Sequence, residues 1–160
     1  MSDLQTLDGE ESLSFPSRAK PKINDYELIR VIGRGSFGEV WIALDATGSA
    51  CALKVIYKGE SNEEKFWKEF DGVTKYLPVS RSNLGLVTIL HVGKDPKKSF
   101  YYYTMELADN ANKNTGKKWE NYRPKTLSSI IKSMVDPVSI KRFEEVCLNL
   151  SDGLSHLHQE

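Results

Sequence analysis

The chain has 160 residues, 39% of them hydrophobic, and its 22 basic residues balance 22 acidic ones. This length is enough for a domain with a substantial core. The zero net charge gives no electrostatic reason to expect nucleic acid or an anionic membrane as a partner. No apolar run approaches the roughly 18 residues that a membrane-spanning helix needs. The acidic N-terminus lacks a signal-peptide core, and Cys51 and Cys147 are far apart, so we expect a cytoplasmic chain with reduced thiols.

The first part of the chain has the pattern of a flexible leader followed by strands and one helix. Residues 1–24 are polar and aperiodic, so we expect them to be flexible. Ser61-Asn62-Glu63-Glu64 fits a capping box, and Phe66, Phe70, Val73 and Leu77 predict a helix that ends at Pro78. Five segments share the apolar alternation or the β-branched and aromatic content of strands: 26–32, 39–44, 49–57, 86–93 and 100–107.

The last part of the chain predicts a linker and two helices. Residues 109–124 are rich in Asn, Lys and Gly and predict a solvated linker that includes Trp119 and Tyr122. A short helix is expected at 126–132, and a longer one from Asp136-Pro137, where a cap residue precedes proline. The apolar stripe of the longer helix, between residues 140 and 157, runs almost to the end of the sequence. We therefore expect part of it to be uncovered and the isolated chain to be poorly soluble or to self-associate.

Three glycines between the first two predicted strands are the main functional signal. Gly33, Gly35 and Gly38 have no Cβ, so backbone N–H groups beside them can approach a phosphate. Lys54, in the third predicted strand, can add a positive charge to the same phosphates. Alone, G-x-G-x-x-G also fits a simple tight turn, and Lys54 alone fits an exposed strand lysine.

The elements around the glycines separate three kinds of nucleotide site. A Walker A loop needs G-x-x-x-x-G-K-[ST], which the sequence lacks. A Rossmann fingerprint needs a helix after the glycines, whereas the alternating run at 40–44 predicts a strand. The order that remains is strand, glycine loop, strand, and a further strand with lysine. This is the order that protein kinases use.

The sequence resembles protein kinases at this point. Residues 32–40 resemble the kinase motif G-x-G-x-x-G-x-V, and Cys51-Ala52-Leu53-Lys54 resembles V-A-I-K. Residues 103–108 resemble the fifth kinase strand and its hinge, and the last helix resembles the one before the catalytic loop. The resemblance runs from about Tyr26 to the C-terminus, in a register similar to bacterial serine/threonine kinases.

The resemblance implies an α+β fold and an ATP site. It places a five-stranded antiparallel small lobe with one long helix at 25–108, a polar insertion at 109–124 and the start of a helical lobe at 125–160. The glycine loop would cover the phosphates, Met105 would be the gatekeeper, and the backbone of Glu106 and Ala108 would bind adenine. The residues implied to contact ATP are Ile32, Gly33, Arg34, Gly35, Ser36, Phe37, Gly38, Val40, Ala52, Lys54, Met105, Glu106 and Ala108.

Lys54 requires a carboxylate that holds it in place. We select Glu69, which flanks the apolar stripe of the first helix, with Glu63 as the alternative and Glu64 as the expected cap partner. A surface glutamate paired with a neighbouring lysine is the simpler interpretation of Glu69. The Tyr101–Tyr103 cluster is expected to serve packing rather than ligand binding, as are His156 and His158 at the end of the last helix.

Two hypotheses about function remain open. The sequence contains neither H-R-D-x-x-x-x-N nor D-F-G, the motifs that carry the catalytic aspartate and the magnesium ligands of kinases. In the first hypothesis, this is the ATP-binding part of a serine/threonine protein kinase that transfers the γ-phosphate to protein hydroxyls. Its catalytic loop and Mg²⁺ ligands would lie beyond residue 160. In the second, it is a non-catalytic nucleotide-binding or interaction module derived from a kinase small lobe. The unfinished final stripe favours the first, and we expect no phosphotransfer from these residues alone.

Overall fold

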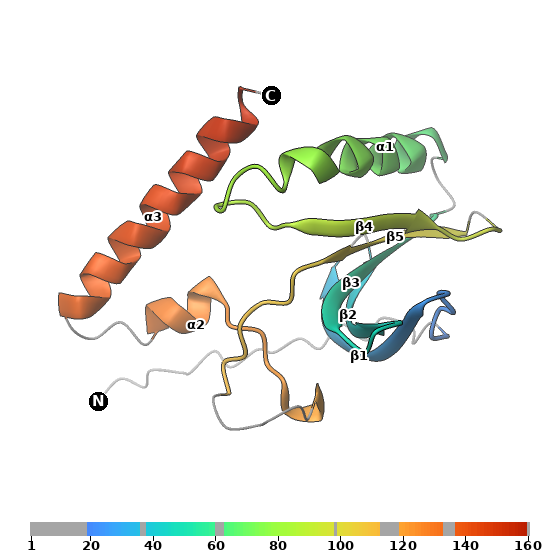
Figure 1. Ribbon diagram of the computed structural model, residues 1–160, viewed down its shortest axis with the longest axis horizontal. Helices are drawn as coiled ribbons and strands as arrows, with labels where there is room; N and C mark the ends of the chain where they lie inside the picture. The colour runs from blue at the N-terminus through green and yellow to red at the C-terminus, as the bar shows by residue number, and fades with distance from the viewer. Residues whose placement is uncertain are drawn as a thin grey trace, which may run out of the picture.

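The computed structural model describes residues 19–35, 38–59, 63–97, 99–112, 119–132 and 137–159. The chain has an α+β fold, as the sequence predicted (Figure 1). Its elements, in chain order, are β1 (Tyr26–Gly35), β2 (Gly38–Asp45), β3 (Ala50–Tyr57), α1 (Glu63–Val79), β4 (Ile89–Lys94), β5 (Phe100–Met105), η1 (Trp119–Asn121), α2 (Leu127–Lys132) and α3 (Pro137–Leu157).

The strands form one five-stranded antiparallel sheet in the order β1-β2-β3-β5-β4. Short turns join β1 to β2, β2 to β3 and β4 to β5, whereas the link from β3 to β4 contains α1. The carboxylate of Asp45 shapes the turn after β2, since its Oδ1 accepts hydrogen bonds from the amides of Thr47 (2.8 Å) and Ser49 (2.9 Å). Gly48 in this turn has a φ of 78°, which glycine adopts without strain.

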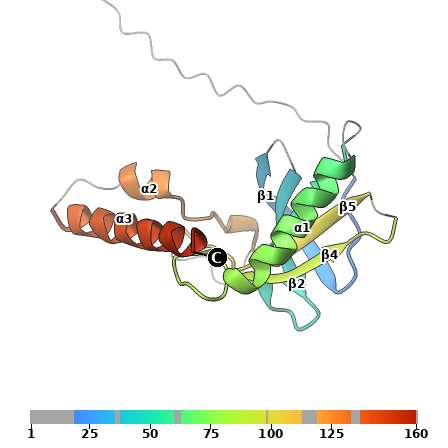
Figure 2. The same ribbon diagram turned by 90° about the horizontal axis from the view of Figure 1, so that it is seen from above.

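Each face of the sheet has its own hydrophobic cluster. Cys51, Leu53 and Val55 of β3 belong to one cluster, and Ile56 belongs to the other, so the predicted alternation of β3 is confirmed. α1 covers the second face beside β4 and β5 (Figures 1 and 2). The expected packing role of the aromatic residues of α1 and β5 is also confirmed. The second cluster and its neighbours comprise Ile56, Phe66, Tyr101, Trp67, Phe70, Val73 and Tyr103.

Several element ends differ from the predictions for local reasons. β4 begins at Ile89 rather than Leu86, because the Ile89 amide donates to the buried Oγ of Ser80 (3.0 Å) and the preceding residues form a loop. β5 ends at Met105 rather than Leu107, because the Glu106 amide bonds to the Thr88 carbonyl outside the ladder (3.2 Å).

The boundaries of α1 and β1 also differ from the predictions. α1 continues through Pro78 to Val79, and the Ser80 amide still donates to the Tyr76 carbonyl in the helical pattern (2.8 Å). Ser61 and Asn62 of the predicted capping box lie outside the described residues. Ile23 is buried and pairs with Tyr26, so the packed part of the chain begins before the expected Asp25.

α2 and α3 lie beside the sheet, beyond the segment that follows β5 (Figures 1 and 2). Thr126 caps α2, because its Oγ1 accepts the Ser129 amide (3.1 Å) while the Ser129 hydroxyl accepts the Thr126 amide (3.1 Å). Phe143, Leu150 and Leu154 of α3 are 43%, 51% and 58% exposed. The expectation that part of the α3 stripe is uncovered is therefore confirmed. None of the described helices is long and apolar enough to cross a bilayer.

α3 is attached to the loop between α1 and β4 by a contact between two glycines, which we call the glycine joint. A Cβ on Gly85 would lie 2.6 Å from the Asn149 carbonyl oxygen, and one on Gly153 would lie 3.2 Å from the Gly85 oxygen. Hydrogen bonds flank this contact, Ser82 Oγ to His156 Nε2 at 2.6 Å and Asn83 Nδ2 to Asp152 Oδ2 at 2.8 Å. His156 therefore serves packing at a helix end, as expected.

Candidate nucleotide-binding site

The register of the sheet brings the predicted nucleotide residues onto one face. Residues paired directly across antiparallel strands project to the same side. The second row from the glycine turn on this face, which we call the phosphate row, consists of Gly33, Val40, Lys54 and Tyr103. The next row on the same face, which we call the base row, consists of Arg30, Ile42, Ala52 and Met105. Sequence positions up to 75 residues apart in the chain thus meet on a single surface.

The glycines of the β1–β2 hairpin have different structural roles. A Cβ on Gly38 would lie 1.9 Å from the Val55 carbonyl oxygen, so packing against β3 requires glycine there. Among the described residues, a Cβ on Gly35 would meet no atom within 4 Å, and one on Gly33 would make only an ordinary contact of 3.7 Å with Val40. The described part of the fold therefore leaves space beside Gly35, where a phosphate could approach the backbone. Ser36 and Phe37 at the tip lie outside the described residues.

Arg34, another residue of the predicted loop, is held by an ion pair. Its Nε lies 3.1 Å from the Glu39 carboxylate on the facing strand, and Glu39 also accepts a hydrogen bond from the Tyr57 hydroxyl (3.4 Å). This pair links β1 to β2 next to the turn of the hairpin.

Lys54 and Glu69 approach the same face of the sheet. Lys54 is half-buried, with its Nζ 5.7 Å from the centre of the Tyr103 ring. Burial raises the pKa of Tyr101 to about 12, and the negative charge of Glu69 adds to this shift. Tyr101 and Tyr103 are on the same side of β5, so Lys54 and Glu69 lie beside neighbouring tyrosines. Among the described residues, however, Lys54 and Glu69 form no ion pair with each other.

Glu63, the alternative carboxylate, is engaged elsewhere. It forms an ion pair with Lys58 at 2.9 Å and accepts a hydrogen bond from the Trp67 indole at 3.2 Å. These contacts hold Glu63 at the start of α1. Of the two carboxylates considered, Glu69 is the one whose negative charge acts on Tyr101, two residues along β5 from Tyr103, the partner of Lys54.

The segment after β5 presents unused backbone groups. Glu106 is fixed by two hydrogen bonds with Thr88, from its own amide to the Thr88 carbonyl (3.2 Å) and from the Thr88 amide to its carboxylate (3.1 Å). Within the described residues, the Glu106 carbonyl and the Ala108 amide have no hydrogen-bond partner. An acceptor and a donor are therefore free beside the half-buried Met105, where the sequence places the adenine contacts.

Residues 119–122 contact the sheet, a feature that the sequence analysis missed. The expectation of a solvated linker is wrong for Tyr122, which is 2% exposed. The Arg30 guanidinium donates to the carbonyls of Trp119 (3.0 Å) and Tyr122, and the Tyr122 hydroxyl donates to the Ala108 carbonyl (2.8 Å). Two signals could have indicated this: an arginine between apolar strand residues, Ile29 and Val31, and aromatic residues within a polar linker.

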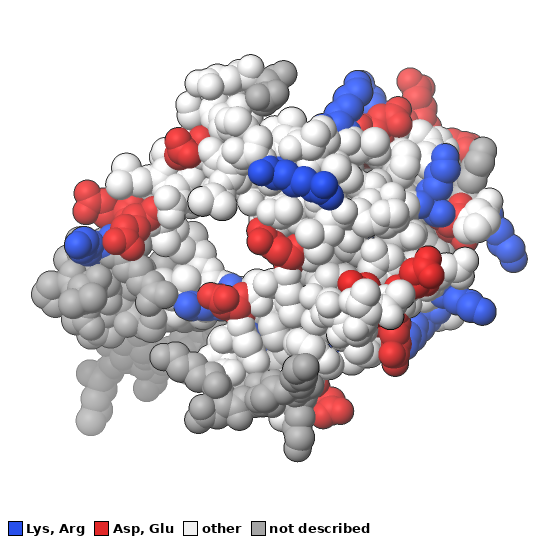
Figure 3. Space-filling view, viewed as in Figure 1, with Lys and Arg blue, Asp and Glu red and all other residues white. Residues whose placement is uncertain are grey.

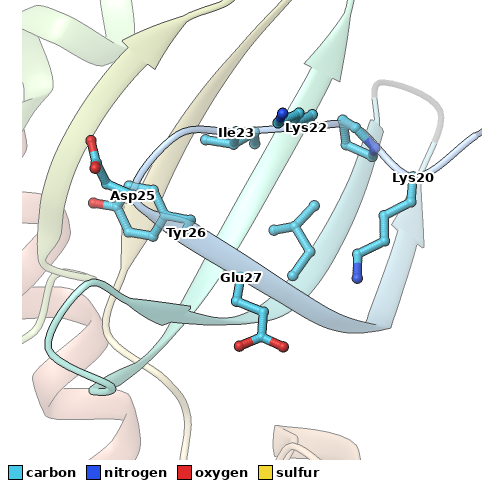
Figure 4. A pocket seen from close by; sticks show the side chains of 8 residues that line it. Lys20, Lys22, Ile23, Asp25, Tyr26 and Glu27 are labelled. Carbon is cyan, nitrogen blue, oxygen red and sulfur yellow. The ribbon is translucent and has the colours of Figure 1, made fainter.

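The described residues do not form a second site with as many candidate ligand-binding groups. They contain no group of three or more His, Cys, Asp or Glu side chains that could hold a metal ion. A groove of about 540 Å³ lies at the start of β1, lined by residues between Lys20 and Leu28 with both charge signs (Figure 4). None of its lining residues is among the predicted ATP contacts. Acidic and basic side chains are interspersed over the face shown in Figure 3.

Comparison with known proteins gives one informative match. No family model matches the chain. A stretch of 52 residues, 31% of this chain, is 40% identical to "Aurora/IPL1-related protein kinase 2" of Caenorhabditis briggsae and spans 17% of that kinase. This partial similarity and the five-stranded antiparallel sheet with α1 fit a kinase-like small lobe.

Proposed function

We propose that this chain is the ATP-binding part of a serine/threonine protein kinase, in the bacterial-type register of its sequence motifs. The observation that carries the proposal is the phosphate row, in which the glycine hairpin and Lys54 meet on one face. The partial similarity to a protein kinase supports the same conclusion.

The described residues fit ATP at both ends of the site. No described atom lies within 4 Å of a Cβ placed on Gly35, so a phosphate could approach the backbone there, and Lys54 would supply a positive charge from the neighbouring phosphate row. The free carbonyl of Glu106 and amide of Ala108 match the donor and acceptor on the adenine edge. ATP would supply the transferable phosphoryl group, and these residues would bind and orient it.

No residue of this sequence is proposed to catalyse phosphoryl transfer. The sequence has no H-R-D or D-F-G motif, and the described residues offer no cluster of metal ligands. We propose that Mg²⁺ and the protein substrate are bound by other parts of the kinase. In this chain, Glu69 would orient Lys54 once α1 brings the two side chains together.

The test is ATP-dependent thermal stabilisation of the 160-residue chain. A ligand at 100 times its Kd stabilises a protein by about 2.7 kcal/mol, so ATP should raise the melting temperature measurably. Lys54→Met should abolish the rise. Lys68→Met, which removes an exposed lysine from α1, is the matched control and should retain it.

Two results would contradict the proposal. Equal stabilisation of wild type and Lys54→Met would show that Lys54 is only a strand lysine, and no stabilisation of the wild type would remove the ATP site altogether. Phosphotransfer by the 160-residue chain with Mg-ATP would contradict the expectation that its residues bind without catalysing.

A further inference from the structure

Arg30 and Tyr122 join three segments that border the proposed site, and we call their contacts the strap. Arg30 belongs to β1, and its guanidinium donates to the carbonyls of Trp119 and Tyr122. Tyr122 in turn donates its hydroxyl to the Ala108 carbonyl at 2.8 Å. The strap therefore connects β1, which forms the roof of the site, to the segment that offers the adenine contacts.

The strap lies at the base end of the site rather than at its phosphate end. Arg30 is in the base row with Ile42, Ala52 and Met105, whereas Lys54 and the glycines are in or beyond the phosphate row. A change in the strap should thus alter the position of the roof over an adenine ring while leaving the glycine hairpin in place.

The segment that carries Tyr122 is itself a closed loop. The Lys125 amide donates to the Asp109 carbonyl (2.8 Å), and the Ala111 amide donates to the Arg123 carbonyl (2.8 Å). Burial raises the pKa of Tyr122, which extends toward alkaline pH the range in which its hydroxyl stays protonated as a donor. Because this loop is closed at its base and Tyr122 is buried, the hydrogen bonds of Arg30 and Tyr122 couple the position of β1 to that of Ala108.

We propose that Arg30 and Tyr122 are positioning residues that fix the spacing between β1 and the Ala108 segment and so preform the slot for the adenosine part of the nucleotide. Fixing this spacing before binding lowers the ordering cost that the ligand would otherwise meet. The inference rests on the proposed function, because it concerns the same nucleotide site.

The experiment compares ligands that occupy different ends of the site. Dissociation constants of adenosine, ATP and inorganic tripolyphosphate are measured by calorimetry for wild type, Arg30→Met and Tyr122→Phe. Arg123→Met is the matched control, because Arg123 is an exposed arginine beside Tyr122 whose side chain takes no part in the strap. Tyr122→Phe removes only the hydroxyl, so it tests the strap even where Arg30→Met folds poorly.

Both strap variants should weaken the binding of adenosine and of ATP by a similar factor, on the order of tenfold in Kd, and leave the Kd of tripolyphosphate unchanged. Lys54→Met should show the reverse pattern, with tripolyphosphate and ATP weakened and adenosine retained. A double variant, Arg30→Met with Tyr122→Phe, should lose little more adenosine affinity than either single variant, because both changes break the same strap.

The outcomes separate this inference from the proposed function. Wild-type binding of ATP with undiminished adenosine affinity in both strap variants would overturn the inference alone. Equal losses for adenosine and tripolyphosphate would also overturn it, since the strap would then support the fold rather than the base end. A wild type that binds none of the ligands would remove the proposed function and this inference with it.

Discussion

Substitution of the hairpin glycines separates a requirement of the fold from a requirement of the ligand. Gly35→Ala introduces a methyl group into space where no atom of the described residues lies within 4 Å, and Gly48 rather than Gly35 has a positive φ. Replacing such a glycine stabilises a protein by about 0.4–1 kcal/mol through the unfolded state. For a chain of this length, 1 kcal/mol corresponds to roughly 2–4 °C in melting temperature. Without ligand, Gly35→Ala should melt at the wild-type temperature or slightly above it.

Gly38→Ala should have the opposite effect on stability. Its Cβ would lie 1.9 Å from the Val55 carbonyl oxygen and 2.9 Å from the Val55 carbonyl carbon, and neither atom can move without displacing β3. Overpacking of this kind costs about 1–3 kcal/mol, and a backbone obstacle places it at the upper end of that range. Gly38→Ala should therefore lower the melting temperature by several degrees.

The two variants are compared by differential scanning calorimetry with and without ATP. If the space beside Gly35 receives a phosphate, the added methyl group must reduce the ATP-induced rise in melting temperature although the unliganded protein is as stable as wild type. The reasoning is refuted if Gly35→Ala keeps the full ATP effect, because the open space would then have no role in binding. It is also refuted if Gly38→Ala is as stable as wild type.

Three further predictions concern stability and association. Ser80→Ala should destabilise the chain by about 1–3 kcal/mol in urea denaturation, because it leaves the buried Ile89 amide without its acceptor. The pKa of Tyr101 is raised from 10 to about 12 in the folded chain, so the neutral phenol contributes its full share of the stability below pH 10. That contribution is lost as the pH rises from 10 toward 12. Tyr101→Phe should therefore lose less stability over that pH interval in alkaline denaturation. Leu150→Lys with Leu154→Lys should reduce self-association in analytical ultracentrifugation, because both leucines are more than half exposed, at 51% and 58%.

Each of these predictions has a clear contrary result. An unchanged denaturation midpoint for Ser80→Ala would mean that Ile89 needs no acceptor in the loop. Identical alkaline curves for wild type and Tyr101→Phe would show that the phenol does not titrate with unfolding. Persistent association of the double lysine variant would place the contact surface somewhere other than α3.

The sequence predicted the sheet well because β-strand alternation is a local property. The different fates of Leu53 and Lys54, one fully buried and one half-buried, follow from adjacent positions on a pleated strand. The glycine spacing likewise indicated a hairpin, whereas the register that aligns Gly33 with Lys54 through Val40 depends on the pairing of β2 with both neighbouring strands. The fold class was therefore predictable from the sequence.

The strap was not accessible, because it depends on contacts between distant segments. An arginine in an apolar strand and aromatic residues in a polar linker indicate that both segments pack, but not that they pack on each other. Arg30 and Tyr122 are 92 residues apart in the chain. The start of β4 was also misplaced, since Leu86 has strand-like neighbours but is buried within a loop. The relation between Lys54 and Glu69 depends on where α1 lies along the sheet, which amphipathic spacing does not determine.

The glycine joint restricts how the helical segment can move relative to the sheet. α3 is held at Gly85 and Gly153 by backbone contact, and the chain leaving β5 holds the same segment at a second place. The close approach leaves no space for a side chain on the loop at this place. A bulkier residue at Gly85 would therefore push the Asn149 carbonyl away and displace α3 from the loop.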